Sequence, residues 1–75
     1  MREPQEFIVF LFPSVSYVLK AEKILKEQGI VHKLIPVPRH ISSDCGVCLR
    51  VAVGQQERVA GVLRGRVDWE RTVFL

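Results

Sequence analysis

The sequence contains only two cysteines, Cys45 and Cys48, three residues apart. Two thiols at this spacing do not provide the disulfide framework of a small secreted protein. No positively charged leader precedes an apolar segment, which argues against a secretory signal. We therefore expect a protein of the cytoplasm, where thiols stay reduced unless they are catalytic or redox-sensing.

Long apolar runs and dense charge are also absent. The longest apolar stretch, 7–13, is far below the ~20 residues that a membrane-spanning helix needs. The net charge is only +3, and the basic residues form no dense stripe with interleaved aromatics, as nucleic-acid binding would favour. Residues 47–53 also lack the aromatics on which RNA bases stack. We expect neither a membrane nor a nucleic-acid partner.

What the chain does have is a hydrophobic content of 48% in 75 residues. This length predicts a single small domain, residues 1–75, with a modest core. A chain of this size often gains stability from a second subunit or a partner surface.

The residue patterns predict four strands and two helices. The expected strands are 6–12, 31–37, 47–53 and 71–75, and the expected helices run from an N-cap at Ser14 or Ser16 to Gly29 and over 55–64. The order βαββαβ is typical of an α+β, ferredoxin-like fold, a four-stranded antiparallel sheet with two helices on one face. The most apolar strands, 6–12 and 47–53, are expected at its centre.

This topology brings several segments to one end of the sheet. The connection 38–46 is expected beside the start of the first helix at Ser14, with Asp68 and Trp69 at the same end. Its nine residues exceed the ~2–5 of an ordinary hairpin. Because functional residues concentrate in loops, this length indicates a functional segment.

Cys45 is the candidate reactive residue of this connection. The thiolate is the reactive form, and helix N-termini or nearby cations lower the pKa of a thiol from ~8.5. The residues expected to tune Cys45 or to bind an anion are Ser14, Arg39, His40, Ser42, Ser43, Gly46 and Arg50. Asp44 is expected to raise the pKa of Cys45 instead, because a neighbouring carboxylate disfavours the thiolate. The alternative is that Cys45 is a small buried hydrophobic residue.

Cys48 is expected to have a different role. Strand alternation places Cys48 and Arg50 on one face and Leu49 and Val51 on the other. Because helices cover only one face, Cys48 is expected on the open face or in a subunit contact. A structural role is favoured, and a resolving thiol for Cys45 is the alternative. The Cys-x-x-Cys spacing matches a dithiol pair, but such a pair normally opens a helix.

No metal or cofactor is expected. The two cysteines and two histidines, His32 and His40, fit no zinc pattern. His32 is expected on a strand surface, and Trp69 in the core or at its rim.

The first strand is apolar on both faces, so one of its residue sets must face away from the helices. The two sets are Phe7, Val9, Leu11 and Ile8, Phe10, Phe12. An apolar patch of this kind usually marks an interface, which favours a homodimer through the open sheet or docking on a larger enzyme.

Ordered motifs between Phe7 and Leu63 resemble a small family of bacterial selenium/sulfur carrier-like proteins. They include Phe-Pro-Ser at 12–14, the run at 19–26, Gly-Ile at 29–30 and above all the run at 36–46. The resemblance implies that Cys45 holds a persulfide or selenopersulfide, with sulfur or selenium donor and acceptor proteins as partners. Arg39, Ser42, Ser43, Gly46 and Arg50 match the family pattern. Asp44 and Cys48 depart from it, since members often have a third serine and a small aliphatic residue there.

We therefore favour a carrier or accessory protein over an enzyme, because no base with an orienting partner is visible. The alternative is a ligand-sensing or protein-docking module in which Cys45 is incidental. Replacement of Cys45 by serine discriminates the two, since it would not change ligand or partner binding in such a module.

Overall fold

The computed structural model describes residues 6–41 and 45–75. In chain order the elements are β1 (Phe7–Leu11), α1 (Val15–Glu27), β2 (Lys33–Pro36), β3 (Val47–Ala52), a 3-10 turn η1 (Val53–Gln55), α2 (Gln56–Leu63) and β4 (Arg71–Phe74).

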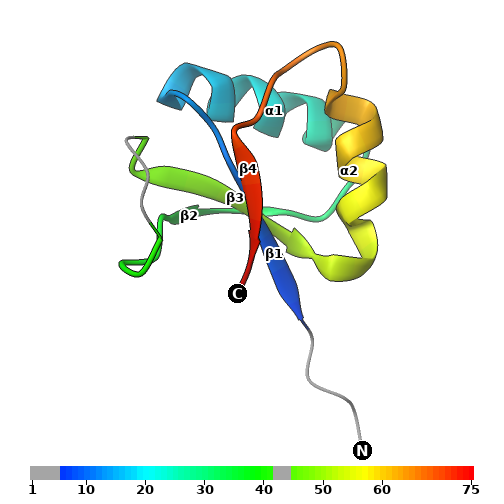
Figure 1. Cartoon of the computed structure of the whole chain (residues 1–75). Coiled ribbons are helices and arrows are strands. Elements are labelled where there is room, and N and C mark those ends of the chain that lie inside the picture. Colours follow the sequence, from blue (N-terminus) through cyan, green and yellow to red (C-terminus); the bar gives the residue numbers. More distant parts are fainter. Residues whose placement is uncertain (1–5, 42–44) are drawn as a thin grey trace, which may run out of the picture.

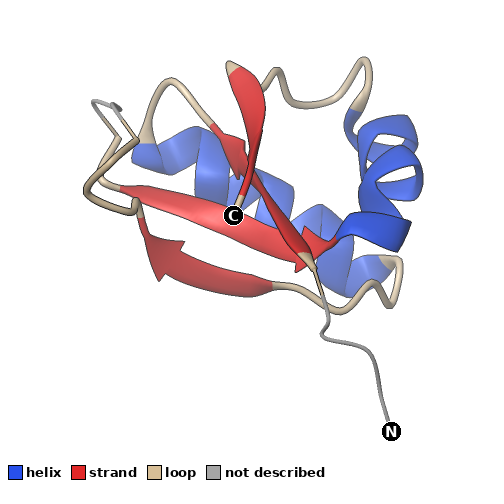
Figure 2. Ribbon diagram, turned by 60° about the horizontal axis from the view of Figure 1, so that its bottom comes forward, coloured by secondary structure: helices blue, strands red, loops and turns tan. Residues whose placement is uncertain are grey.

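The four strands form one antiparallel sheet in the order β2-β3-β1-β4. The two most apolar strands, β1 and β3, are therefore central, as their composition predicts. Both helices lie on the same side of this sheet (Figures 1 and 2). The predicted α+β, ferredoxin-like arrangement is confirmed.

Helix α1 begins after Ser14 and ends in a Schellman motif at Gly29. The amide of Ile30 donates to the carbonyl of Leu25 at 3.0 Å, and the amide of Gly29 donates to Lys26 at 3.1 Å. This ending requires a residue with positive φ. Gly29 has φ of 68° and adopts it without strain because glycine has no Cβ atom.

No helix within residues 6–41 and 45–75 is long and apolar enough to cross a bilayer.

The main core lies between the sheet and the two helices. Its sheet side comes from one face of β1 and of β3, and its helix side from the apolar stripes of α1 and α2. Its central members are Ile8, Phe10, Phe12, Val18, Ala21, Leu25, Leu49, Val51, Val59 and Leu63. Trp69 packs edge-on against Phe10 with ring centroids 5.4 Å apart, which confirms its predicted place in or beside the core.

Strand β2 is shorter than the predicted strand 31–37. It pairs with β3 only from Lys33 opposite Arg50 to Pro36 opposite Val47. Val31 is 86% exposed and lies outside the sheet. The apolar pattern suggested a longer strand, but the chain leaving Gly29 joins the ladder only at Lys33.

The sheet face opposite the helices carries a second, smaller core. Val9, Leu11 and Cys48 are fully buried there together with Ile41 from the connection after β2. A turn in which the Ile41 amide donates to the Pro38 carbonyl at 2.9 Å directs Ile41 onto the sheet. The expectation that Val9 and Leu11 form an exposed apolar patch is therefore wrong, because other residues of the same chain cover both side chains.

Candidate functional site

Cys45 lies at the end of the β2–β3 connection, two residues before β3. It is a half-buried thiol and packs against the rim of the main core. Gly46 follows with φ of 85°, a conformation that glycine adopts without strain. Its carbonyl accepts the amide of Val37 at 3.0 Å. The two ends of the connection are therefore fastened together directly beside Cys45.

The N-terminus of α1 lies at the same end of the sheet as this connection (Figures 1 and 2). Ser14 occupies the predicted N-cap position, but its side chain caps no helix amide, and its hydroxyl instead lies 3.0 Å from that of Ser16. The first turn contains no acidic residue. Because the first turn has neither a side-chain cap nor a carboxylate of its own, its amides leave partial positive charge at this end of the helix.

The start of β4 reaches this end as well. The amide of Glu70 donates to the carbonyl of Leu11 at 2.6 Å, so the segment with Asp68 and Trp69 lies beside the end of β1. The predicted meeting of these segments is confirmed.

The other predicted tuning residues are placed differently. Arg39 and His40 are exposed in the turn before Ile41. Ser42, Ser43 and Asp44 lie outside the described residues. Arg50 projects from the open face of β3, whereas Cys45 packs on the helix side. The structure therefore separates Arg50 from the thiol that it was expected to tune.

Cys48 is fully buried on the open face, beneath Ile41. Burial raises the pKa of the Cys48 thiol to about 11, and the nearby Cys45 makes a smaller contribution in the same direction. A thiol of this kind stays protonated at neutral pH and is a poor nucleophile. Cys45 and Cys48 also belong to hydrophobic clusters on opposite faces of the sheet, an arrangement that favours the structural role for Cys48.

His32 precedes β2 and is half-buried against α1. Its Nδ1 lies 2.8 Å from the Ile30 carbonyl oxygen, and its Nε2 lies 3.5 Å from Oε2 of Glu22. The expectation of a strand surface residue is wrong, because His32 links α1 to the chain entering β2. In residues 6–41 and 45–75, no three histidine, cysteine or acidic side chains gather in a way that could hold a metal.

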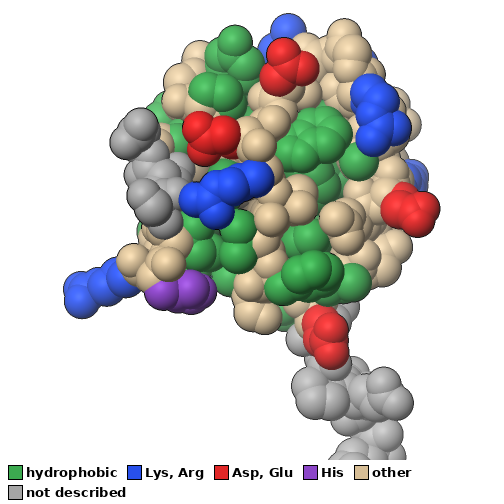
Figure 3. Space-filling model, viewed as in Figure 1, with side chains coloured by type: hydrophobic (Ala, Val, Ile, Leu, Met, Phe, Trp, Pro, Cys, Tyr) green, Lys and Arg blue, Asp and Glu red, His purple; other side chains and the backbone are tan. Residues whose placement is uncertain are grey.

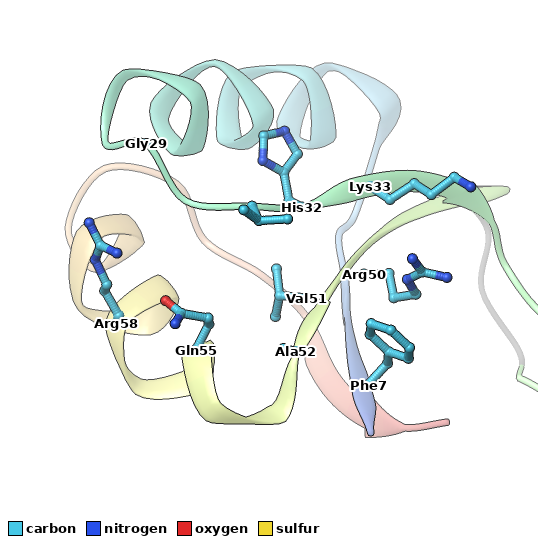
Figure 4. Close-up of a pocket in the computed structure, with 10 residues that line it drawn as sticks. Phe7, Gly29, His32, Lys33, Arg50, Val51, Ala52, Gln55 and Arg58 are labelled. Carbon is cyan, nitrogen blue, oxygen red and sulfur yellow. The ribbon is translucent and has the colours of Figure 1, made fainter. Parts of the chain in front are cut away.

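A pocket of about 570 Å³ lies between the segment entering β2 and the corner from β3 into α2 (Figure 4). Three basic side chains, Lys33, Arg50 and Arg58, line it, and no aspartate or glutamate among the described residues does. The guanidinium carbon of Arg50 lies 4.1 Å from the centroid of the Phe7 ring.

Only Arg50 of this basic group was singled out from the sequence. Lys33 and Arg50 both fall in predicted strands, but the sequence did not fix the register that places them opposite each other. Arg58 lies on a helix surface, where a lone arginine carries no signal.

Comparisons with known proteins cover most of this architecture. The sequence profile of a family described as "Putative Se/S carrier protein-like" matches residues 7–71, from β1 to the first residue of β4. A protein of Escherichia coli K12, "Uncharacterized protein YtiA", is 28% identical over 64 residues, which cover 85% of this chain and 74% of the relative. No solved structure matches the chain significantly.

Proposed function

The chain belongs to the Se/S carrier protein-like family, and from this membership we propose that Cys45 carries sulfur or selenium as a persulfide or selenopersulfide. The observation that supports this role most strongly is the position of Cys45. It is a half-buried thiol in the connection whose ends are joined by the bond between Val37 and Gly46. Membership also confirms the resemblance that the motifs indicated.

The loading step is a thiol exchange. The Cys45 thiolate attacks the outer sulfur of a donor persulfide, and a new S–S bond forms to Sγ of Cys45. The S–S bond within the donor breaks, and its electron pair leaves with the donor sulfur as a thiolate. The step requires no external oxidant or reductant. Attack by an acceptor nucleophile on the outer sulfur of Cys45 then returns the thiolate of Cys45. A donor selenopersulfide reacts in the same way at selenium.

The surroundings of Cys45 suit both steps. Half-burial leaves the sulfur within reach of a partner, while packing against the core holds its position. The end of α1 adds partial positive charge at this end of the sheet without a first-turn carboxylate to cancel it, and positive potential favours a thiolate. Arg39 and His40, exposed in the same connection, are in a position to meet an anionic partner.

The partners that this role implies are a donor protein and an acceptor protein. The connection carrying Cys45 is the surface that both would share, because the same sulfur is loaded and unloaded. The expected cytoplasmic location stays a prediction. It suits this chemistry, because a reducing compartment keeps Cys45 as a thiol between cycles.

The loading experiment uses glutathione persulfide as the donor. The protein is incubated with it, free thiols and persulfides are alkylated with iodoacetamide, and Cys45 is located by peptide mass spectrometry. We expect one added sulfur, about 32 Da, on the wild type and on Cys48→Ala, and none on Cys45→Ser. Loading of Cys45→Ser equal to that of the wild type would contradict the proposal.

A further inference from the structure

We propose that the pocket between β2 and the β3–α2 corner binds a small organic anion, whose phosphate or carboxylate group lies between Lys33 and Arg50. This binding site is separate from Cys45 and goes beyond the carrier function.

The first observation is a pair of like charges. Lys33 and Arg50 are directly opposite in the antiparallel ladder of β2 and β3, so their side chains leave the same face of the sheet. Like charges at such positions repel and destabilise a sheet. Within residues 6–41 and 45–75, no acidic residue lines the pocket to offset them. An anion bound between Lys33 and Arg50 would convert this repulsion into two attractions.

The second observation is the state of the Arg50 side chain. Its guanidinium lies over the ring of Phe7 (Figure 4), and Arg50 pairs with Lys33 across the ladder. Its Nε is buried and has no hydrogen-bond partner among the described residues. A buried donor without a partner is costly in a folded protein. Arginine also presents a planar fork of donors that matches phosphate and carboxylate.

The third observation is the size and character of the pocket. A volume of about 570 Å³ lies within the range of small-molecule sites, so the pocket has room for a ligand larger than an inorganic ion. Val51 and Ala52 form part of its wall between the Lys33–Arg50 end and the Arg58–Gln55 end (Figure 4). This wall suits an apolar body attached to the anionic group.

The opposite end of the pocket offers further polar groups. Arg58 donates to the Gln28 carbonyl at 3.0 Å and is thereby held in place. The buried Oε1 of Gln55 has no partner in the described part of the chain. A polar group at the far end of the ligand could bond to the Gln55 carboxamide, which places the anionic head at Arg50 and this second group at Gln55.

The test is a titration followed by amide chemical shifts at low salt. The probes are phenyl phosphate, 3-phenylpropionate, inorganic phosphate and the neutral 3-phenylpropanol. We expect saturable shifts at Lys33, Arg50, Val51 and Ala52 with at least one of the two organic anions. The tighter of these two identifies the headgroup. We expect inorganic phosphate and 3-phenylpropanol to bind at least about fivefold more weakly, since each lacks one of the two contacts.

Variants assign the binding to the basic pair. Lys33→Gln and Arg50→Gln are each expected to weaken binding of the tighter probe about tenfold, because each removes a hydrogen bond to a charged group. Lys26→Gln removes an equal charge from the exposed face of α1 and should leave binding unchanged. Cys45→Ser should also leave it unchanged, which separates this site from the carrier role. Lys33 is exposed, so its replacement leaves the fold intact.

Three results would overturn the proposal. The first is the absence of saturable binding of either organic anion. The second is an equal loss of binding affinity in Lys33→Gln and Lys26→Gln. The third is binding of 3-phenylpropanol as tight as that of the anions.

A further readout needs no ligand. Lys33→Gln relieves the repulsion with Arg50, so it should raise the urea midpoint of the ligand-free protein, and a lowered midpoint would contradict the like-charge argument.

Discussion

The two cysteines have opposite environments although only two residues separate them in the sequence. Cys45 is half-buried at the rim of the main core, and Cys48 has no exposed surface. Strand alternation correctly predicted that Cys48 faces away from the helices. Its burial could not be predicted, because Ile41, which covers it, comes from a connection without a periodic pattern.

The buried thiol of Cys48 predicts a pH-dependent stability. Its pKa is raised from the ordinary value of 9.0 to about 11, so its stabilising contribution is complete below pH 9 and is lost as pH rises through 11. Between these values the unfolded chain releases the proton and the folded chain keeps it. At about 1.36 kcal/mol per unit, the free energy of unfolding should fall by roughly 2 kcal/mol at about pH 10.5.

Urea unfolding at about pH 7.5 and about pH 10.5 measures this effect. Lysines and tyrosine also titrate in this range, so the informative quantity is the difference between the wild type and Cys48→Ala. The wild type should lose about 2 kcal/mol more stability than the variant over this interval. Equal losses would show that Cys48 is not protected as a neutral thiol.

At the scale of elements, the residue patterns predicted α1, α2 and the four strands, and the bounds of β2 were predicted least well. Strand β1 is a short apolar run that is buried at four consecutive positions, and helix α1 buries residues at helical spacing, so each pattern determines both type and position. Strand β2 is an edge element with one half-buried and three exposed residues. Its length therefore depends on where it meets β3 rather than on its own sequence.

The connection between β2 and β3 is held to the sheet by Ile41. This residue is 7% exposed and packs in the cluster of Val9, Leu11 and Cys48. We expect Ile41→Ala to reduce the free energy of unfolding by about 2 kcal/mol, the lower end of the cost of such truncations. We also expect faster alkylation of Cys48 in the folded protein, because its cover becomes incomplete.

Val31→Ala is the matched control, since Val31 is an aliphatic residue that is 86% exposed. Its stability and the alkylation rate of Cys48 should equal those of the wild type. If Ile41→Ala behaved like Val31→Ala in both measurements, Ile41 would not be anchoring the connection.

Two glycines provide opposite predictions at this scale. Gly46 has φ of 85°, and Gly61 lies inside α2, yet an added Cβ at either position has no contact within 4 Å in the part of the chain that the structure describes. Gly46→Ala should cost about 1–2 kcal/mol because its left-handed backbone is strained for alanine. Gly61→Ala should stabilise the protein by about 0.5–1 kcal/mol because it improves helix propensity. Thermal or urea unfolding distinguishes these effects, and destabilisation by Gly61→Ala would contradict this description of α2.

At the scale of the whole molecule, the sheet presents a face that the chain only partly covers. Hydrophobic side chains reach the surface in separate patches on the side crossed by β4 (Figure 3). Phe74 and Leu75 are the large exposed hydrophobic residues at this edge, 63% and 51% exposed. The homodimer predicted through the open sheet stays a prediction, with less apolar surface available than the sequence suggested, because Val9 and Leu11 are already buried.

Predictions from sequence were most successful where they depended on topology and least successful where they depended on loop conformation. The βαββαβ order predicted that Ser14, the Cys45 connection and the start of β4 meet at one end of the sheet. Topology alone did not show that Arg50 lies on the open face of the sheet, away from Cys45. The alternation of side chains along β3 did place Arg50 on the same face as Cys48. The basic pocket required the register of Lys33 against Arg50, which only the folded sheet defines.

The central claim is that Cys45 carries sulfur or selenium, and the intact mass of the protein isolated from its host under non-reducing conditions tests it most directly. We predict an added mass of about 32 Da for sulfur or about 80 Da for selenium. This mass should map to Cys45, disappear after treatment with a thiol reductant, and be absent from Cys45→Ser prepared in the same way. An unmodified Cys45 in protein isolated in the presence of its donor, or the same adduct on Cys45→Ser, would contradict the account.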